Sequence, residues 1–118
     1  IFGAAHPSLL CATLYADRLG AFDEAAEIAE ALIAIPSVDM TPQVTMEAHR
    51  LLARCHGARG ENTAACETLE RALAISKAVG YVWYDVLILR DMLKWMSSDE
   101  EVAAKRAEID VLAVGFTE

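Results

Sequence analysis

The sequence predicts an all-α fold of three helical hairpins, and three observations favour it. Alanine is the commonest residue, runs of β-branched residues are absent, and apolar residues recur at the helical period of 3.6. Only 6 glycines and 3 prolines interrupt the 118 residues, and 55% of the residues are hydrophobic, which excludes a mainly disordered chain. No apolar run has the length of a membrane span. We therefore expect one domain over residues 1–118.

The first hairpin is expected over residues 7–35. Pro7 can open a helix that continues to Leu19, because proline is tolerated at the first helical position, and Gly20 ends it. A second helix is expected from Asp23 to Ile35, with apolar residues on one side and glutamates on the other. Pro36 stops this helix.

The second hairpin is expected over residues 41–79. Thr41 is a suitable N-cap, and Pro42 follows it at the first position of a helix that reaches about His56. A tight turn bracketed by Gly57 and Gly60 leads to a helix over residues 62–79. Gly80 fits the position just after the end of that helix, where a left-handed backbone is usual.

The third hairpin is expected over residues 82–115. Its first helix, Val82 to Met96, is apolar nearly all round, which predicts burial on every side. An exposed aromatic surface for a partner is the alternative interpretation of this helix. Ser98 and Glu101 have the spacing of a capping box, so a sixth helix is expected from there to about Val114.

Two of the hairpins share a spacing. Gly20 and Gly60 are 40 residues apart, and so are Ala25 and Ala65, which follow the glycines at the same distance. Two helices approach closely only where the side chain at the crossing point is small. We expect both alanines to occupy such crossing points.

Residues 60–73 resemble the second half of the tetratricopeptide repeat (TPR) motif. The matching residues are the turn glycine Gly60, the small Ala65 and Ala72, and the large Leu69; residues 20–25 match the same turn. The resemblance implies a right-handed solenoid of about three antiparallel helical hairpins, TPR-like, in which the chain is a possible fragment of a longer array. The spacing of 40 residues exceeds the usual period of the family, and the connector at residues 36–41 holds the excess.

In the family that the chain resembles, the first helices of the hairpins line a concave groove that binds a partner segment. Carried over by register, the lining residues are Leu10, Leu14, Glu47, Arg50, Arg54, Tyr84, Ile88 and Trp95, with Asp17 beside the leucines and Asp85 as the alternative to Tyr84. Arg50 and Arg54 are four residues apart on one helix face, so together they could hold a carboxylate of a peptide. The alternative is that they only pair with Glu47 and nearby acidic residues.

Catalytic and metal-binding motifs are absent from the sequence. His6, His49 and His56 lack the further ligands that zinc would need, and no nucleophile or phosphate-binding motif occurs. We therefore predict no enzyme activity, no metal and no cofactor. The three cysteines, Cys11, Cys55 and Cys66, are an odd number without a CxxC pair. They predict free thiols and an intracellular, reducing location, in the cytoplasm or an organelle interior.

The net charge of −8, from 10 basic and 18 acidic residues, argues against nucleic acid and anionic membranes as partners. Together these features predict a non-enzymatic module for protein–protein interaction or scaffolding, with a protein or peptide in the groove and no direct membrane insertion. The alternative is an architectural subunit of a large assembly, buried through its aromatic fifth helix. Apolar residues near the start (Ile1, Phe2, Leu9 and Leu10) predict that the N-terminal end docks on preceding repeats or another subunit.

Overall fold

The computed structural model describes residues 2–117 and, within this range, the side chains other than those of residues 2–4, 37 and 115–117. Ile1 and the Phe2 side chain, to which the expectation about the N-terminal end refers, thus lie outside the described part. Residues 2–117 contain no strand, which confirms the all-α class. Their elements are α1 (Phe2–Leu19), α2 (Phe22–Ile33), the short 3₁₀ helix η1 (Ser37–Asp39), α3 (Pro42–Ala58), α4 (Asn62–Val79), α5 (Val82–Leu93) and α6 (Asp99–Thr117).

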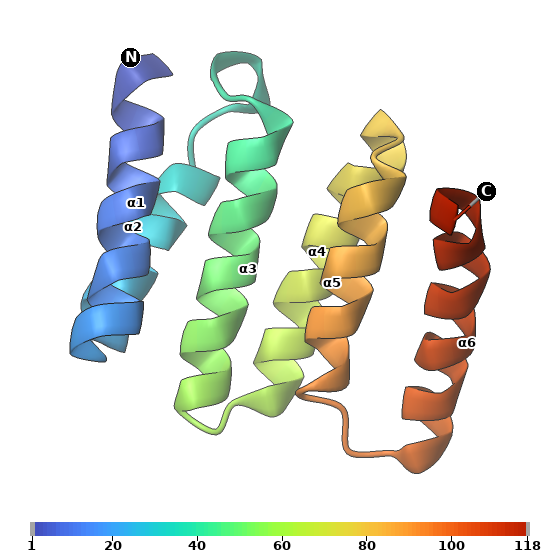
Figure 1. Cartoon of the computed structure of the whole chain (residues 1–118). Helices are drawn as coiled ribbons and strands as arrows, with labels where there is room; N and C mark the ends of the chain where they lie inside the picture. The colour runs from blue at the N-terminus through green and yellow to red at the C-terminus, as the bar shows by residue number, and fades with distance from the viewer. Residues whose placement is uncertain (1, 118) are drawn as a thin grey trace.

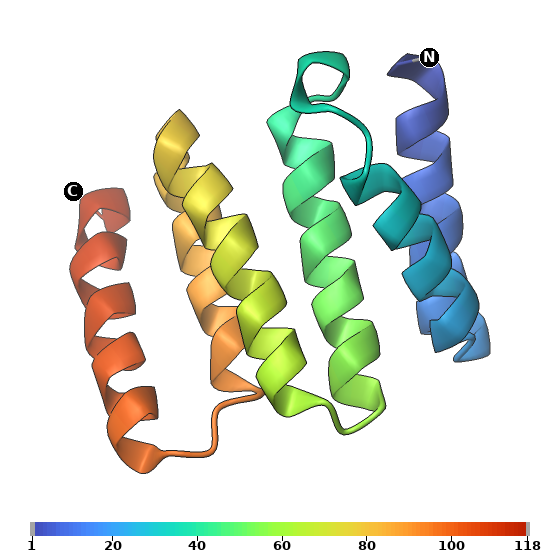
Figure 2. The ribbon, with the colours of Figure 1, turned by 180° about the vertical axis from the view of Figure 1, so that it is seen from behind.

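The helices lie side by side in chain order, and the chain reverses direction at each connection (Figure 1). Each helix packs against the next one, most extensively α3 against α4, and α3 also packs against α1. α1 and α5 lie in front of α2 and α4 in Figure 1 and behind them in Figure 2. One face of the molecule is therefore formed by the odd-numbered helices α1, α3 and α5.

Three of the connections are tight turns built on glycine. Gly20, Gly60 and Gly80 have φ angles of 63°, 78° and 77°, in the left-handed region that residues with a Cβ seldom adopt. At the last of these turns the Tyr81 N–H donates to the Ser76 carbonyl at 3.0 Å, and the corresponding bond closes the turn at Gly60. These bonds satisfy carbonyl groups that a helix end leaves free. The glycines expected to end helices therefore do so.

Small side chains form much of the contact between the first three helices. Ala25 and Ala65 have no exposed surface, as the expected position at a helix crossing requires. Ala25 belongs to a cluster in which α1, α2 and α3 meet, mostly through alanines, and Ala65 lies in the core between α3, α4 and α5. The largest fully buried side chains around Ala65 are Met46, Leu69, Ile88, Leu89 and Met92.

Several helix ends differ from the expected ones. α1 begins at Phe2, so Pro7 lies inside it rather than at its start. Because proline has no N–H, one helical hydrogen bond of α1 is not formed there. α2 ends at Ile33, two residues early. Gly57 lies within α3 instead of in the turn.

The fifth and sixth helices also differ in length. α5 ends at Leu93 rather than Met96, because the Trp95 N–H donates to the Met92 carbonyl three residues back, which tightens the last turn. α6 starts as expected, with the Glu101 N–H donating to Ser98 Oγ at 3.4 Å, and it continues to Thr117. Thr41 precedes α3 without a capping hydrogen bond from its side chain.

The expectation that the fifth helix is buried on every side is wrong. Ile88, Leu89 and Met92 are buried, but Val82 and Trp83 are 43% and 58% exposed. The reason is that α4 and α6 are the helices packed closely on α5, so a third side of its first turn stays open. In the described residues no helix has both the length and the apolar character needed to cross a membrane.

Candidate interaction groove

A hollow of about 330 Å³ lies where α1, α3 and α5 face the same side of the molecule. We call it the α1–α3–α5 groove. Thr13 and Leu51 line it together with six charged residues, namely Asp17, Glu47, Arg50, Arg54, Asp91 and Lys94. Every one of the three helices contributes a charged side chain, so the groove is a polar surface shared by helices far apart in the sequence.

The two arginines of α3 link that helix to both of its neighbours. Arg54 donates to the Asp17 carboxylate on α1, and both side chains are nearly half exposed. Arg50 Nε donates to Asp91 Oδ2 on α5 at 2.5 Å, and Arg50 Nη1 donates to Glu47 Oε1 at 2.8 Å. Both arginines are therefore paired with acidic residues of the protein itself. This is the alternative to the expectation that they hold a carboxylate of a peptide.

The Arg50 pairs are the less exposed ones. Burial opposes the charged form of Arg50, but the hydrogen bond and charge of Asp91, joined by those of Glu47, raise the pKa of the guanidinium above its usual value. Tyr84 lies beside the same cluster. Burial, followed by the charge and hydrogen bond of Glu47, raises the pKa of the Tyr84 phenol. Both residues thus keep their ordinary protonation state at neutral pH.

Lys94 differs from the arginines because, within the described part of the chain, it forms no ion pair. Neither Lys94 nor Asp91 was among the residues expected to line the groove. The sequence holds a signal for both. Asp91 lies 7 residues after Tyr84 and Lys94 lies 10 residues after it, so both continue the face of Tyr84, and both are polar in or directly after a mostly apolar helix. The expected register was off by one residue.

Two of the expected α5 residues lie elsewhere. Ile88 is fully buried in the core, so its side chain is not on the groove surface. Trp95 is half-buried and lines a different cavity, between α4, α5 and α6. Asp85, the alternative to Tyr84, is buried too, and its Oδ1 has no hydrogen-bond partner among the described residues.

The leucines expected on α1 are exposed but lie apart from the arginines. Leu10 and Leu14 are 64% and 54% exposed. Leu14 lines a shallow apolar hollow on α1 itself, with Tyr15 and Leu19. The structure thus brings Glu47, Arg50, Arg54 and Asp17 together with Tyr84 next to them, whereas the leucines form a separate surface.

The histidines and cysteines lie apart from the groove. His49 is buried and donates from Nδ1 to the Thr45 carbonyl at 2.8 Å, and His56 Nδ1 lies 2.8 Å from Glu61 Oε1. Burial raises the pKa of the Cys55 and Cys66 thiols, which lowers their reactivity. Among the described residues no group of three histidine, cysteine or carboxylate side chains could hold a metal ion.

A comparison of the chain with models of protein families, with curated proteins and with solved structures finds no match. The chain's strongest local feature is the set of ion pairs that joins α3 to α1 and α5.

Proposed function

We propose that the chain is a non-enzymatic protein-interaction module of the TPR-like type, which binds a segment of a partner protein in the α1–α3–α5 groove. The observation that carries this proposal is that the three helices which begin the three hairpins share one charged hollow. In stacked helical repeats the equivalent helices of successive units line such a surface.

The proposal includes a right-handed solenoid of three antiparallel hairpins. It is supported by the alternating course of the helices in Figure 1 and by the buried Ala25 and Ala65, 40 residues apart. The left-handed glycines Gly20 and Gly60 precede these alanines by the same distance. A repeated turn followed by a repeated small residue is what a repeated hairpin requires.

The charges in the groove favour a partner segment that carries a carboxylate. Lys94 has no ion-pair partner in the described structure, and Arg54 has only the half-exposed Asp17. An exposed pair of this kind contributes about 0–1 kcal/mol, so a partner's carboxylate can replace Asp17 at little cost. Arg50 stays with Asp91 and Glu47, and it fixes the spacing between α3 and α5.

The test is selection of peptides from a displayed library, followed by measurement of their affinity for variants. Lys94→Glu reverses the unpaired charge, so we expect selected peptides to bind this variant about tenfold more weakly or worse. Arg90→Glu is the matched control, because Arg90 is exposed on α5, four residues before Lys94, and does not line the groove. Equal loss in both variants, or none in either, would contradict binding in the groove.

A second candidate function, an architectural subunit of a larger assembly, is favoured by one surface. Large apolar side chains are exposed where α4 meets α5, namely Val79 (41%), Tyr81 (39%), Val82 (43%) and Trp83 (58%). Contiguous apolar patches typically mark contacts with other proteins. If this patch is a contact, Trp83→Ser should raise the solubility limit of the isolated chain severalfold. Val111→Ser, which removes an even more exposed residue (75%) from α6, should leave solubility unchanged.

The exposed side chains of α1 support docking of the N-terminal end on preceding repeats or on another subunit. Leu10, Leu14, Tyr15 and Leu19 are between 40% and 71% exposed along this one helix. Measurement of the mass in solution tests this part of the proposal. Self-association that Leu14→Ser abolishes supports it, and a monomer at every concentration contradicts it.

A further inference from the structure

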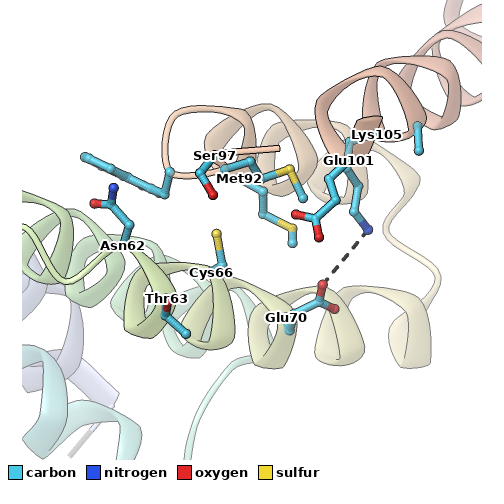
Figure 3. Close-up of a pocket in the computed structure, with 11 residues that line it drawn as sticks. Asn62, Thr63, Cys66, Glu70, Met92, Ser97, Glu101 and Lys105 are labelled. Carbon is cyan, nitrogen blue, oxygen red and sulfur yellow. Dashed lines mark ion pairs between the residues drawn. The ribbon is translucent and has the colours of Figure 1, made fainter. Parts of the chain in front are cut away.

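A second cavity lies between α4, α5 and α6, and it shares no lining residue with the α1–α3–α5 groove. Its volume of about 620 Å³ is within the range of sites that hold small organic molecules. Figure 3 shows Cys66, Met92 and Glu101 pointing toward one another from these three helices. We call it the α4–α6 cavity.

One side of the α4–α6 cavity is aromatic and rich in sulfur. Met92, Trp95, Met96 and Cys66 line it, and Met92 is only 1% exposed. Thioethers and aromatic rings are polarisable, so this side suits an apolar or aromatic body.

Trp95 is held in place from behind. A Cβ built on Gly57 of α3 would lie 2.3–2.5 Å from three carbon atoms of the Trp95 ring, so the ring packs directly on a glycine backbone. Any other residue at position 57 would place its Cβ where the Trp95 ring lies. The indole therefore packs on α3 and at the same time lines the cavity.

The rim of the cavity is negative. Glu70, Glu101 and Lys105 line it, which gives two carboxylates and one ammonium group. Lys105 Nζ lies 4.0 Å from Glu70 Oε1 and 3.6 Å from Glu108 Oε2, so carboxylates already surround its charge (Figure 3 shows the first pair). Glu101 forms no ion pair with any described residue.

The two rim carboxylates also act on the cavity interior. Burial first, and then the charges of Glu101 and Glu70, raise the pKa of the Cys66 thiol, while the charge of Lys105 lowers it by a smaller amount. Two carboxylates against one ammonium group at the rim, with Glu101 outside any ion pair of the described residues, disfavour a bound anion and favour a bound cation.

We propose that the α4–α6 cavity binds a protonated organic amine with an apolar or aromatic body. The ammonium group pairs with Glu101, and the body packs against Met92 and Trp95, where a cation near the indole face gains further attraction. A free amine and the side chain of a lysine beside an aromatic residue in a peptide share this chemistry. The site is independent of the groove, so either can fail without the other.

The test uses Trp83→Phe, which leaves Trp95 as the sole tryptophan, so that its fluorescence reports on the cavity. Three probes of one shape are titrated at neutral pH: phenylbutylammonium, phenylbutanol and phenylbutanoate. We expect saturable binding of the ammonium compound. The alcohol should bind at least about tenfold more weakly, and the carboxylate should not bind. Equal affinity for the amine and the alcohol, or no saturation with the amine, overturns the proposal.

A charge variant identifies the pairing group. Glu101→Gln should weaken binding of phenylbutylammonium about tenfold, because it removes the carboxylate and keeps the shape of the side chain. Glu100→Gln is the matched control, since Glu100 lies in the same first turn of α6 outside the cavity. Equal effects of the two variants overturn the assignment to Glu101.

Competition by the peptide acetyl-Phe-Lys-amide distinguishes the two sources of the amine. Displacement of phenylbutylammonium by this peptide at similar affinity supports a lysine side chain as the occupant, and displacement only at much higher concentration supports a free amine. Lys94→Glu, which disables the groove, should leave both affinities unchanged, so a loss of binding in this variant overturns the independence of the two sites.

Discussion

Gly57 shows how one missing methyl group determines where a distant side chain packs. It lies inside α3, where alanine would favour the helix by about 1 kcal/mol, yet the Trp95 ring of the following hairpin occupies the space of its Cβ. The sequence suggests a turn at Gly57 because glycine usually marks one. Its role in packing depends on α5, and no spacing within α3 indicates it.

The first prediction concerns this contact. Gly57→Ala should lower the free energy of unfolding by about 1–3 kcal/mol, because the new methyl group overlaps the indole. In a Trp95→Ala background the same substitution should stabilise the protein by up to about 1 kcal/mol, because only helix propensity remains. Urea unfolding of the four proteins measures both values. The same sign in both backgrounds would contradict the packing.

The second prediction concerns His49 and pH. Burial lowers its pKa below the usual value of about 6.5, and the hydrogen bond to Thr45 offsets this only in part. Between the folded value and 6.5 the unfolded chain binds more protons, so the free energy of unfolding should fall as pH falls through this window. Chemical unfolding at several pH values should show a shallower decline in His49→Gln. His6→Gln, at an exposed position of α1, should leave the slope unchanged.

Among whole elements, α4 matches the expected ends at both residues, Asn62 and Val79. Its end is set locally, by a glycine that the turn requires at Gly80. The end of α5 is different. Nothing near Met96 forbids helix, and the last turn instead tightens where Trp95 meets α3. Local signals thus predict the ends that local chemistry sets, and they miss the ones that packing sets.

The third prediction concerns the turn at Gly80. A Cβ at this position would meet nothing within 4 Å, so the cost of a substitution comes only from the φ angle of 77°. Gly80→Ala should lower the free energy of unfolding by about 1–2 kcal/mol, and Gly80→Asn by less, because asparagine tolerates the left-handed region. Thermal or urea unfolding ranks the three proteins. Equal losses for alanine and asparagine would mean that the backbone angle is not the cause.

For the molecule as a whole, stability should be uneven along the stack. α3 packs on α1, α2 and α4, whereas α6 packs closely only on α5, and none of its described side chains is fully buried. Ion pairs from Lys105 to Glu70 and from Lys77 to Glu108 fasten it to α4, and such exposed pairs contribute little.

The fourth prediction follows from this difference. Amide hydrogens of α6 should exchange with solvent much faster than those of α3 and α4, because α6 can open without breaking the buried core. Native-state hydrogen exchange measured by mass spectrometry resolves the helices. Protection of α6 equal to that of α3 would show that the stack unfolds as one unit instead.

The groove is a property of the whole molecule, and the sequence predicted it only in part. Glu47, Arg50 and Arg54 share a helix, so their common face follows from spacing alone. Asp17 and Asp91 join them across 37 and 41 residues of chain, and the rotation of α5 about its own axis decides whether Asp91 or Ile88 faces the arginines. That rotation is set by packing on α4 and α6.

The alanine contacts between the first three helices have an entropic consequence. Alanine has no side-chain torsion to restrict, so bringing Ala12, Ala25 and Ala29 into contact costs almost no rotamer freedom, unlike the methionines and leucines around Ala65. These alanine contacts therefore bury little apolar area per residue and also restrict few side-chain torsions on folding. The balance between buried apolar area and lost side-chain entropy should therefore differ between these alanine contacts and the methionine- and leucine-rich core around Ala65.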